Sequence, residues 1–579
     1  MKLLKKLSWF FKLEKWPYIT GILALSLVSL LNLLPPRVIG EVIDQIASKD
    51  LTNLELAYQL FVLVLSALAM YALRFVWRKY ILGTANRLGR ILRYRLFEHF
   101  TRMSPSFYQT YRTGDLMAHA TNDINAVVGV AGGGVMSAVD ASITALVTIL
   151  TMFFVLDWRL TLIAILPLPF MAWGTSLIGR KNHESFKAAQ EAFSDLNNKV
   201  QESVSGIKVT KSFGYQDAET AAFARINQDV FKKNILAAKY NALFDPMVLI
   251  FVGLSYLLTL IFGGLFISQG QLTVGELVTF ITYLDMLVWP LQAMGYLFNI
   301  SQRGTVSYER IESLLAQESD VIEVASPIKD IKNGRLDYSI QEFAYDDRPT
   351  HRDLHFSIEQ GQTLGIVGVT GSGKTTLLRL LLREQDIQDG NICLAGHDIR
   401  DYSLSALRSL IGYVPQDQIL FATSIRDNIR FGNPSLSDED VIAVTKLCGI
   451  YEDIMQMPDG FDTLVGERGV SLSGGQKQRL AMCRALILNP EILILDDSLS
   501  AVDAKTEHLI LDNLKRERSG KTTLITAHRL SAVVHADLIL VLDQGRIIES
   551  GSHQELLTQD GWYATTYQNQ QLAESLEEV

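Results

Sequence analysis

The sequence predicts an α-helical membrane domain of six transmembrane helices with long cytoplasmic extensions, fused to an α/β domain. At 579 residues the chain is too long for one ordinary domain, and its 48% hydrophobic content is unevenly spread. Almost all the long apolar runs lie before residue 300, and each is near the roughly 20 residues that a helix needs to cross a bilayer. The second half instead contains a short apolar strand, a glycine-rich loop and a helix in succession, an order that indicates an α/β domain.

The distribution of cations orients the six predicted transmembrane helices. Lys and Arg are concentrated before residue 18 and in the second and fourth connections, whereas the other three connections carry no more than two cations each. The positive-inside rule therefore predicts that both termini are cytoplasmic. Because the basic N-terminus lacks a cleavage site of small residues, we interpret the first apolar run as a membrane helix and not as a signal peptide. The helices are predicted at residues 18–34, 56–76, 127–156, 160–178, 247–267 and 277–300.

The two cytoplasmic connections, at about 78–112 and 180–240, are long and helical in character. We expect the membrane helices to continue beyond the bilayer, and each connection to end in a turn that can touch a soluble domain. From residue 301 to 331 the chain becomes polar and charged, which marks the link to the second part. The predicted domains are a transmembrane domain at 1–305, a linker at 306–335 and an α/β domain at 336–579.

Two carboxylates inside the spans are candidates for a role in function. An Asp at the centre of a membrane helix costs about 2.5–3.5 kcal/mol, so Asp140 and Asp285 are expected to face a cavity or a partner. A substrate role competes with two alternatives, an interhelical hydrogen bond and a position nearer the headgroups. Pro290 predicts a kink soon after Asp285. The aromatic residues that could line an apolar cavity are Trp289, Phe244 and Tyr283.

Composition excludes some classes of partner and site. The net charge of −9 at pH 7 gives no indication of a nucleic-acid partner. The three cysteines, Cys393, Cys448 and Cys483, have no metal-ligand spacing, so we interpret them as reduced thiols of a cytosolic domain.

The glycine-rich loop has the composition of a phosphate-binding loop. Residues 368–375 read GVTGSGKT, which fits the pattern of Gly, four residues, Gly, Lys and Ser or Thr. The glycines let successive backbone N–H groups turn toward phosphate oxygens, and the helix N-terminus adds its positive dipole. Lys374 can reach the β and γ phosphates, and the Thr375 hydroxyl can ligate Mg²⁺. The motif therefore predicts a bound nucleotide.

Two further motifs make the prediction specific. Residues 492–495 are apolar residues of a buried strand, and Asp496 at its end can hold the Mg²⁺ of bound ATP through water. Residues 472–476 read LSGGQ and precede this strand by about twenty residues. In this order the three motifs resemble the ATPase domain of ABC transporters. The resemblance covers nearly the whole chain, because six spans followed by one ATPase domain resemble a type IV half-transporter.

The resemblance implies roles for individual residues. Tyr345 resembles the aromatic residue that stacks on adenine, Gln416 the Q-loop glutamine that senses Mg²⁺, and His528 the switch histidine near the γ phosphate. Residues expected to contact ATP are Tyr345, Gly368, Thr370, Gly371, Ser372, Gly373, Lys374, Thr375, Thr376, Ser473, Gly475 and Gln476. Those expected to serve Mg²⁺ are Thr375, Gln416 and Asp496, and those expected to act in catalysis are Asp497, His528 and Gln416.

Three segments resemble parts of the family that transmit motion. Residues 500–503 resemble the D-loop, and residues 463–469 resemble a segment that in exporters contacts the cytoplasmic ends of the membrane helices. Gly114, Asp115 and Leu116 resemble a motif of the first cytoplasmic loop.

One position departs from the family pattern. The residue after the Walker B aspartate is usually Glu, which polarises the attacking water, and here it is Asp497. Because Asp is shorter by roughly 1.5 Å, and a misplacement of about 1 Å can cost around 100-fold in rate, hydrolysis at this chain's own site is expected to be weak. An intact LSGGQ beside a weakened Walker B site resembles the degenerate-site subunit of bacterial heterodimeric multidrug exporters. A homodimer with two slow sites remains an alternative.

The resemblance implies ATP-driven efflux of hydrophobic or cationic amphiphilic drugs by alternating access. The protein is expected in the plasma membrane of a bacterium, among lipids and beside a second half-transporter, with its ATPase domain in the cytoplasm. Lipid flipping is the alternative within transport, and an ATP-gated regulatory ABC protein is a less favoured one.

Overall fold

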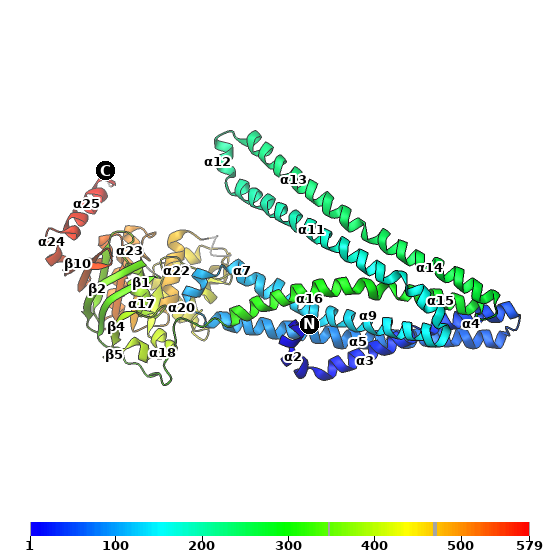
Figure 1. Cartoon of the computed structure of the whole chain (residues 1–579). Helices are drawn as coiled ribbons and strands as arrows, with labels where there is room; N and C mark the ends of the chain where they lie inside the picture. Colours follow the sequence, from blue (N-terminus) through cyan, green and yellow to red (C-terminus); the bar gives the residue numbers. More distant parts are fainter. Residues whose placement is uncertain (1, 346–347, 467–471, 578–579) are drawn as a thin grey trace. The chain divides into compact units, whose positions relative to one another are not determined.

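The computed structural model describes residues 2–345, 348–466 and 472–577. These fold into two compact units. Unit 1 comprises residues 1–101 and 114–317, and unit 2 comprises residues 102–113 and 318–579. Figure 1 shows the helical unit 1 and the mixed α/β unit 2, so the predicted fold class is confirmed.

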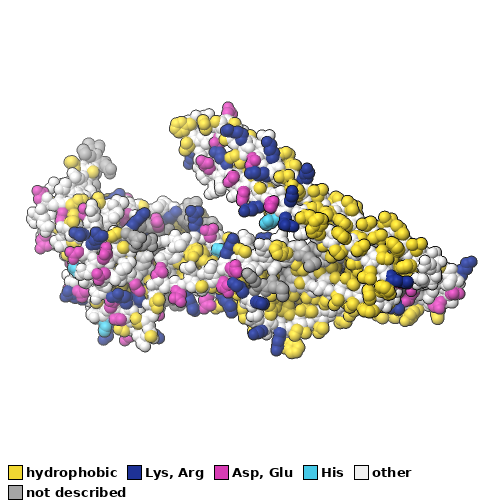
Figure 2. Space-filling model, in the orientation of Figure 1, with side chains coloured by type: hydrophobic (Ala, Val, Ile, Leu, Met, Phe, Trp, Pro, Cys, Tyr) yellow, Lys and Arg dark blue, Asp and Glu magenta, His cyan; other side chains and the backbone are white. Residues whose placement is uncertain are grey.

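Among the described residues, six helical spans are long and apolar enough to cross a membrane, and they make up most of unit 1. The spans are Lys15–Ser48, Asn53–Arg102, Thr113–Leu156, Trp158–Ser205, Gln216–Ser268 and Val274–Leu315. Each is 34 to 53 residues long, well beyond the roughly 20 that a bilayer requires, so the helices extend outside it. Figure 2 shows hydrophobic side chains gathered over one zone of this unit, with charged side chains beyond it along the arm of the α11–α13 hairpin and hydrophobic ones again at the end of that arm.

Most spans are built from more than one helix. The helices of unit 1 are α1 (Lys2–Lys6), α2 (Ser8–Leu13), α3 (Lys15–Leu31), α4 (Leu34–Ser48), α5 (Asn53–Arg102), α7 (Thr113–Ala118), α8 (Ile124–Gly129), α9 (Val135–Thr151), α10 (Trp158–Ile165), α11 (Pro167–Ser205), α12 (Ile207–Ser212), α13 (Gln216–Ala242), α14 (Phe244–Ser268), α15 (Val274–Met286) and α16 (Val288–Leu315). Short π-helical turns lie at η1 (His119–Asp123), η2 (Val130–Gly134) and η3 (Met152–Leu156).

Prolines mark the breaks within the first, fourth and sixth spans. Helices α4 and α11 begin with Pro in their first turn, and Pro290 lies in the first turn of α16. Pro is tolerated there because it has no N–H to donate and the first-turn N–H groups have no partner inside the helix. The predicted bend after Asp285 is therefore present as the junction between α15 and α16 at Leu287.

The polar stretch that begins at residue 301 is partly helical. Helix α16 continues to Leu315, and the chain then crosses unit 2. There the Glu323 carboxylate accepts a hydrogen bond from the Leu404 N–H at 2.6 Å, and the Ile328 N–H donates to the Asp401 carbonyl at 2.9 Å. Residues 301–315, expected from the sequence to be part of the link, therefore continue the last membrane helix. Their polar side chains are compatible with a helix that has left the bilayer.

Unit 2 is built on two sheets. The six-stranded sheet has the order β10-β9-β3-β8-β7-β6, with β10 antiparallel to β9 and the other neighbours parallel. The four-stranded sheet has the order β2-β1-β4-β5 and is antiparallel. The strands are β1 (Leu336–Tyr345), β2 (Arg348–Ile358), β3 (Thr363–Gly368), β4 (Asp389–Leu394), β5 (His397–Asp398), β6 (Ile411–Val414), β7 (Ile492–Asp496), β8 (Thr522–Thr526), β9 (Leu538–Asp543) and β10 (Arg546–Gly551).

The helices of unit 2 cover both faces of the parallel sheet. They are α6 (Pro105–Thr110), α17 (Lys374–Leu381), α18 (Leu404–Ser409), α19 (Ile425–Ile429), α20 (Asp438–Leu447), α21 (Tyr451–Met455), α22 (Gly474–Leu486), α23 (Ala504–Glu517), α24 (His553–Thr558) and α25 (Trp562–Glu577). Strand β7 is buried at every residue, and its side chains alternate between two hydrophobic clusters, with Leu493 and Leu495 in one and Ile492 and Ile494 in the other. This central strand carries Asp496 at its carboxyl end.

Candidate functional site

The phosphate-loop motif joins the carboxyl end of β3 to the start of α17. Gly368, Gly371 and Gly373 have φ angles of 143°, 83° and 101°, which L side chains rarely adopt. A Cβ at Gly373 would lie 2.5 Å from Cε1 of His351, and one at Gly368 would collide with the Leu542 carbonyl oxygen. The glycines are therefore required by both the turn and the close packing beneath it.

Two buried polar groups of this loop fit a phosphate ligand. The Lys374 ammonium donates to the carbonyls of Gly368 at 2.9 Å and Val369 at 3.0 Å, which holds it inside the loop. Burial lowers the pKa of Lys374, while Asp497 and Asp496 act in the opposite direction. The Ser372 hydroxyl is buried and, within the described chain, has no hydrogen-bonding partner. Phosphate oxygens would satisfy both groups.

Asp496 is held by three hydroxyl groups. Its Oδ1 accepts hydrogen bonds from Thr375 at 2.9 Å and Thr526 at 2.7 Å, and its Oδ2 accepts one from Tyr413 at 3.3 Å. The carboxylate is almost fully buried. The structure thus brings Thr375 and Asp496 together, the hydroxyl and carboxylate that would hold Mg²⁺ beside the phosphates. The sequence reasoning missed Thr526 and Tyr413, which come from neighbouring strands.

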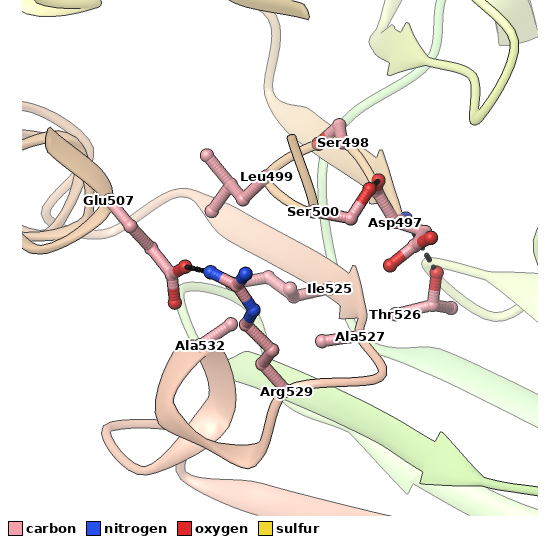
Figure 3. Close-up of a pocket in the computed structure, with 10 residues that line it drawn as sticks. All are labelled: Asp497, Ser498, Leu499, Ser500, Glu507, Ile525, Thr526, Ala527, Arg529 and Ala532. Atoms are coloured by element: carbon pink, nitrogen blue, oxygen red, sulfur yellow. Dashed lines mark hydrogen bonds and ion pairs between the residues drawn. The ribbon is translucent and has the colours of Figure 1, made fainter. Parts of the chain in front are cut away.

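Asp497 lies directly beyond β7 in a left-handed backbone conformation, with a φ of 45°. Its N–H donates to the Thr526 carbonyl and hydroxyl oxygens, both at 3.1 Å, and Gln416 donates to its Oδ2 at 3.4 Å. The catalytic candidates Asp497 and Gln416 are therefore in contact. Figure 3 shows a pocket in which Asp497 and Thr526 lie across from an ion pair between Glu507 and Arg529, whose charged atoms are 3.7 Å apart.

The loop that carries His528 is held by the C-terminal helix. Gln570 on α25 donates to the His528 carbonyl at 2.9 Å and accepts from the Leu530 N–H at 2.9 Å. The amide thus bonds to the backbone on both sides of Arg529. Sequence reasoning did not find Gln570, because a single Gln in a polar helix carries no motif.

The LSGGQ motif forms the N-terminus of α22, a helix of 13 residues. The Ser473 hydroxyl accepts from the Gln476 N–H at 3.3 Å, and Gln476 accepts from the Ser473 N–H at 3.1 Å, which makes a capping box. A Cβ at Gly475 would lie 2.8 Å from the Ala501 carbonyl oxygen, so Gly lets the helix approach residues 500–503 closely. The remaining N–H groups of the first turn are oriented for an anion.

Tyr345, the candidate for stacking on adenine, lies at the end of β1. Its ring packs edge to face on Phe343 at 5.1 Å between centroids. It lines a pocket together with Arg379 and Glu384, and with Ser106 and Gln109 of the first cytoplasmic connection. Thr370 is exposed on the phosphate loop, and Thr376 is half-buried in the first turn of α17.

The predicted transmission segments are only partly described. Residues 463–466 pair with the loop before α19, through a 3.0 Å bond from the Ile425 N–H to the Thr463 carbonyl. Glu467, Arg468 and Gly469 lie outside the described residues. Gly114, Asp115 and Leu116 form part of α7, in which Leu116 is buried.

In unit 1 the two intramembrane acids have different neighbours. Asp285 accepts a hydrogen bond from the Tyr256 hydroxyl at 3.1 Å, whereas Asp140 lies within hydrogen-bonding range of the Trp289 side chain and near Arg74. The interpretation of Tyr283 as a cavity-lining residue is wrong. Its ring is buried in a hydrophobic cluster. Its hydroxyl donates at 2.8 Å to the carbonyl of Leu33, which lies between α3 and α4.

Known proteins that resemble this chain do so over almost its whole length. The family model of the ABC transporter transmembrane region matches residues 18–291, and that of the ABC transporter matches residues 351–500. The probable multidrug resistance ABC transporter ATP-binding/permease protein YheI of Bacillus subtilis is 43% identical over 98% of both chains. The multidrug resistance-like ATP-binding protein MdlA of Escherichia coli is 40% identical over 100% of this chain and 98% of its own.

A flippase and a solved exporter are also similar. The ATP-dependent lipid A-core flippase of Syntrophus aciditrophicus is 34% identical over 84% of this chain and 80% of its own. The structure of a bacterial Atm1-family ABC exporter with ATP bound has a TM-score of 0.81 and 28% identity, covering 96% of this chain and 99% of that one.

These relatives confirm the coarse prediction of function. The chain is an integral membrane protein with an ATPase domain that drives export, and exporters of this type work as dimers. The chain belongs to the ABC transporters and has the exporter fold of that family.

Proposed function

We propose that the chain is one half of a heterodimeric exporter of hydrophobic and amphiphilic drugs. The observation that carries the proposal is the combination of Asp497 with a well-formed LSGGQ helix. Because each ATP of an ABC dimer lies between the Walker motifs of one subunit and the LSGGQ of the other, the two sites of the pair would differ. This chain's Walker motifs form a degenerate site, and its Ser473, Gly475 and Gln476 complete the partner's consensus site.

The geometry around Asp497 supports slow hydrolysis at the chain's own site. The carboxylate is one methylene shorter than that of Glu, and its backbone is tied to Thr526 on the adjacent strand. The backbone therefore cannot advance to compensate for roughly 1.5 Å of lost reach, which corresponds to a loss of about 100-fold in rate. ATP held by Lys374, Thr375 and Asp496 would stay bound for longer and keep the two ATPase domains together.

The α11–α13 hairpin supports the proposal that ATP binding is coupled to transport. Helix α12 at its tip has no buried residue, and the side chains of Ile207, Val209 and Phe213 are exposed. We propose that this apolar tip docks on an ATPase domain and carries its motion along α11 and α13 into the spans (Figure 1). The basic connections support a cytoplasmic location for this hairpin. We propose that the protein lies in the plasma membrane of a bacterium and that substrates leave the cell through it.

Lipid transport is the second candidate, because a relative at 34% identity is named as a lipid A-core flippase. The two closer relatives reported above carry multidrug names, which favours drugs. A homodimer of this chain stays the alternative assembly, and ATP gating without pumping a further one.

The fate of bound nucleotide tests the degenerate site directly. The assembled pair is loaded with radiolabelled ATP and Mg²⁺, washed, and the retained nucleotide is identified by chromatography. We expect wild type to retain intact ATP at one site per pair, and Asp497→Glu to convert that nucleotide to ADP. Complete conversion in wild type would show that Asp497 is a competent base. Efflux of a fluorescent drug and flipping of a labelled lipid, measured in the same vesicles, distinguish the two substrate classes.

A further inference from the structure

The carboxylate of Asp285 lies deep in the membrane part of unit 1. It follows Val274, the first residue of α15, by 11 residues, or about 16 Å at 1.5 Å per residue. Its hydrogen-bonding partner Tyr256 precedes Ser268, the last residue of α14, by 12 residues, or about 18 Å. With the loop between α14 and α15 on the outer side, both side chains lie near the middle of a hydrocarbon core about 30 Å thick.

Asp140 has a different environment. It precedes Leu156, the outer end of its span, by 16 residues, or about 24 Å, which places it nearer the cytoplasmic headgroups. The Arg74 guanidinium and the Trp289 indole are both close enough to interact with its carboxylate. A neighbouring cation of this chain therefore offsets part of the charge of Asp140.

Asp285 has no such compensation. Among the described residues its side chain bonds only to the neutral Tyr256 hydroxyl, which engages Oδ1 and leaves Oδ2 without a donor. The side chain is exposed on the surface of the unit, and so are the apolar residues Leu260 of α14 and Trp289 of α16, which follow Tyr256 and Asp285 by four residues each. A carboxylate facing lipid at this depth costs about 2.5–3.5 kcal/mol. The surface around Asp285 is therefore expected to face a water-filled path, a cation or the partner subunit, and not lipid.

We propose that Asp285 binds the positively charged group of a cationic amphiphile, while Leu260, Trp289 and the Tyr256 ring contact its apolar body. The inference rests on the proposed drug export and assigns its substrate class to one of the two intramembrane acids. A permanent cation would be attracted to Oδ2 by its charge. It would not need to break the hydrogen bond from Tyr256, because that bond engages Oδ1. Charge complementarity, and not apolar area alone, would then select these substrates.

The test compares a permanent cation with an uncharged molecule in the assembled transporter. Binding of tetraphenylphosphonium and of uncharged Nile red is measured without ATP, and ATP-driven uptake of ethidium and Nile red is measured in inverted vesicles. Asp285→Asn should weaken tetraphenylphosphonium binding about 10-fold and leave Nile red binding within about 2-fold. Asp285→Glu should restore most of the cation binding, and Tyr256→Phe should retain the preference for the cation.

Asp140→Asn is the matched comparison, since it removes the same charge from the other acid. We expect it to change both ligands by the same factor. The inference is overturned if Asp285→Asn leaves the ratio of the two affinities unchanged, or if Asp140→Asn lowers that ratio as much. Failure of the proposed function has a different signature, which is ATP hydrolysis by wild type without uptake of either dye.

Discussion

At the scale of single residues, His351 couples the antiparallel sheet to the phosphate loop. It is fully buried on β2, with its ring beneath Gly373. Burial lowers the pKa of His351 below its usual value of 6.5, against a smaller opposing effect of the Gly545 and Gly373 backbones. The imidazole is therefore neutral in the folded domain, and protonation would place a charge in a site that excludes water.

The first prediction concerns the stability of unit 2 in acid. Because the pKa of His351 is lower in the folded than in the unfolded chain, the unfolded chain binds more protons below pH 6.5, and stability falls as the pH falls through that range. The contribution is at most about 1.4 kcal/mol per pH unit. His351→Leu should remove this slope in denaturant titrations of the full chain between pH 5 and pH 7. His355→Leu, on the exposed part of the same strand, should leave it in place, and equal slopes for wild type and His351→Leu would contradict the assignment.

The second prediction concerns Thr526, whose hydroxyl donates to Asp496 and accepts from the Asp497 N–H. Thr526→Val keeps the shape of the side chain but leaves the buried carboxylate with one donor fewer. A hydrogen bond to a charged group contributes about 1.5–3 kcal/mol, so the Mg²⁺ concentration needed for ATP binding should rise about 10-fold. Titration of Mg²⁺ in a nucleotide-binding assay measures it. Exposed Thr558→Val is the control, and an unchanged Mg²⁺ requirement in Thr526→Val would refute the role.

Site residues that belong to a continuous motif could be predicted from the sequence, whereas those that meet only through the fold could not. The phosphate loop could be predicted because its chemistry lies in eight consecutive residues, whose glycines have the positive φ angles that the motif needs. Thr526, Tyr413 and Gln570 could not, because their contacts with Asp496 or His528 depend on the order of strands and the course of the last helix. Tyr283 was misread because an aromatic residue in a span looks the same whether it packs or lines a cavity.

At the scale of elements, the C-terminal helix α25 contacts the loop that carries the catalytic candidate His528. Its Gln570 bonds to the backbone on both sides of Arg529 and so restrains the loop at His528. Gln571, next along the helix, contacts only the Tyr567 hydroxyl of its own helix through its side-chain amide, within the described chain. The two glutamines form a matched pair for mutation.

The third prediction is that Gln570→Ala slows the chemical step at the chain's own site. In an Asp497→Glu background, where turnover there is measurable, kcat should fall several-fold while the KM for ATP stays unchanged, because the phosphate loop is untouched. Gln571→Ala should leave both constants at the background value. Steady-state hydrolysis by the assembled transporter, with thermal unfolding as a check of the fold, measures this. A rise in KM without a change in kcat would show that α25 acts on binding instead.

The helices of unit 1 illustrate how hydropathy predicts spans but not their internal structure. Each predicted apolar run of about 20 residues marks part of a helical span of 34 to 53 residues, because hydropathy detects only the part inside the bilayer. The junction at Leu287 could be anticipated from Pro290, whereas the π-helical turn around Gly132 has no sequence rule that would predict it.

At the scale of the whole molecule, the proposals give different tasks to the two halves of one chain. The ATPase unit would bind ATP through the phosphate loop and Asp496, supply in Asp497 a base shorter than Glu, and contribute its LSGGQ helix to the partner's site. The membrane unit has two acids, of which Asp140 has a cation nearby and Asp285 bonds to the Tyr256 hydroxyl. Such an exporter would depend on its partner for hydrolysis and on Asp285 for selecting cations.

The rate of ATP hydrolysis in lipid tests this asymmetry most directly. The chain is measured alone and co-expressed with a candidate second half-transporter, in each case with Asp497→Asn and, in the pair, with the partner's Walker B Glu changed to Gln. We expect little activity of the chain alone, strong activity of the pair, loss of that activity on changing the partner's Glu, and only a small effect of Asp497→Asn. Full activity of the chain alone, abolished by Asp497→Asn, would contradict this expectation and establish a homodimer in which Asp497 is a competent base.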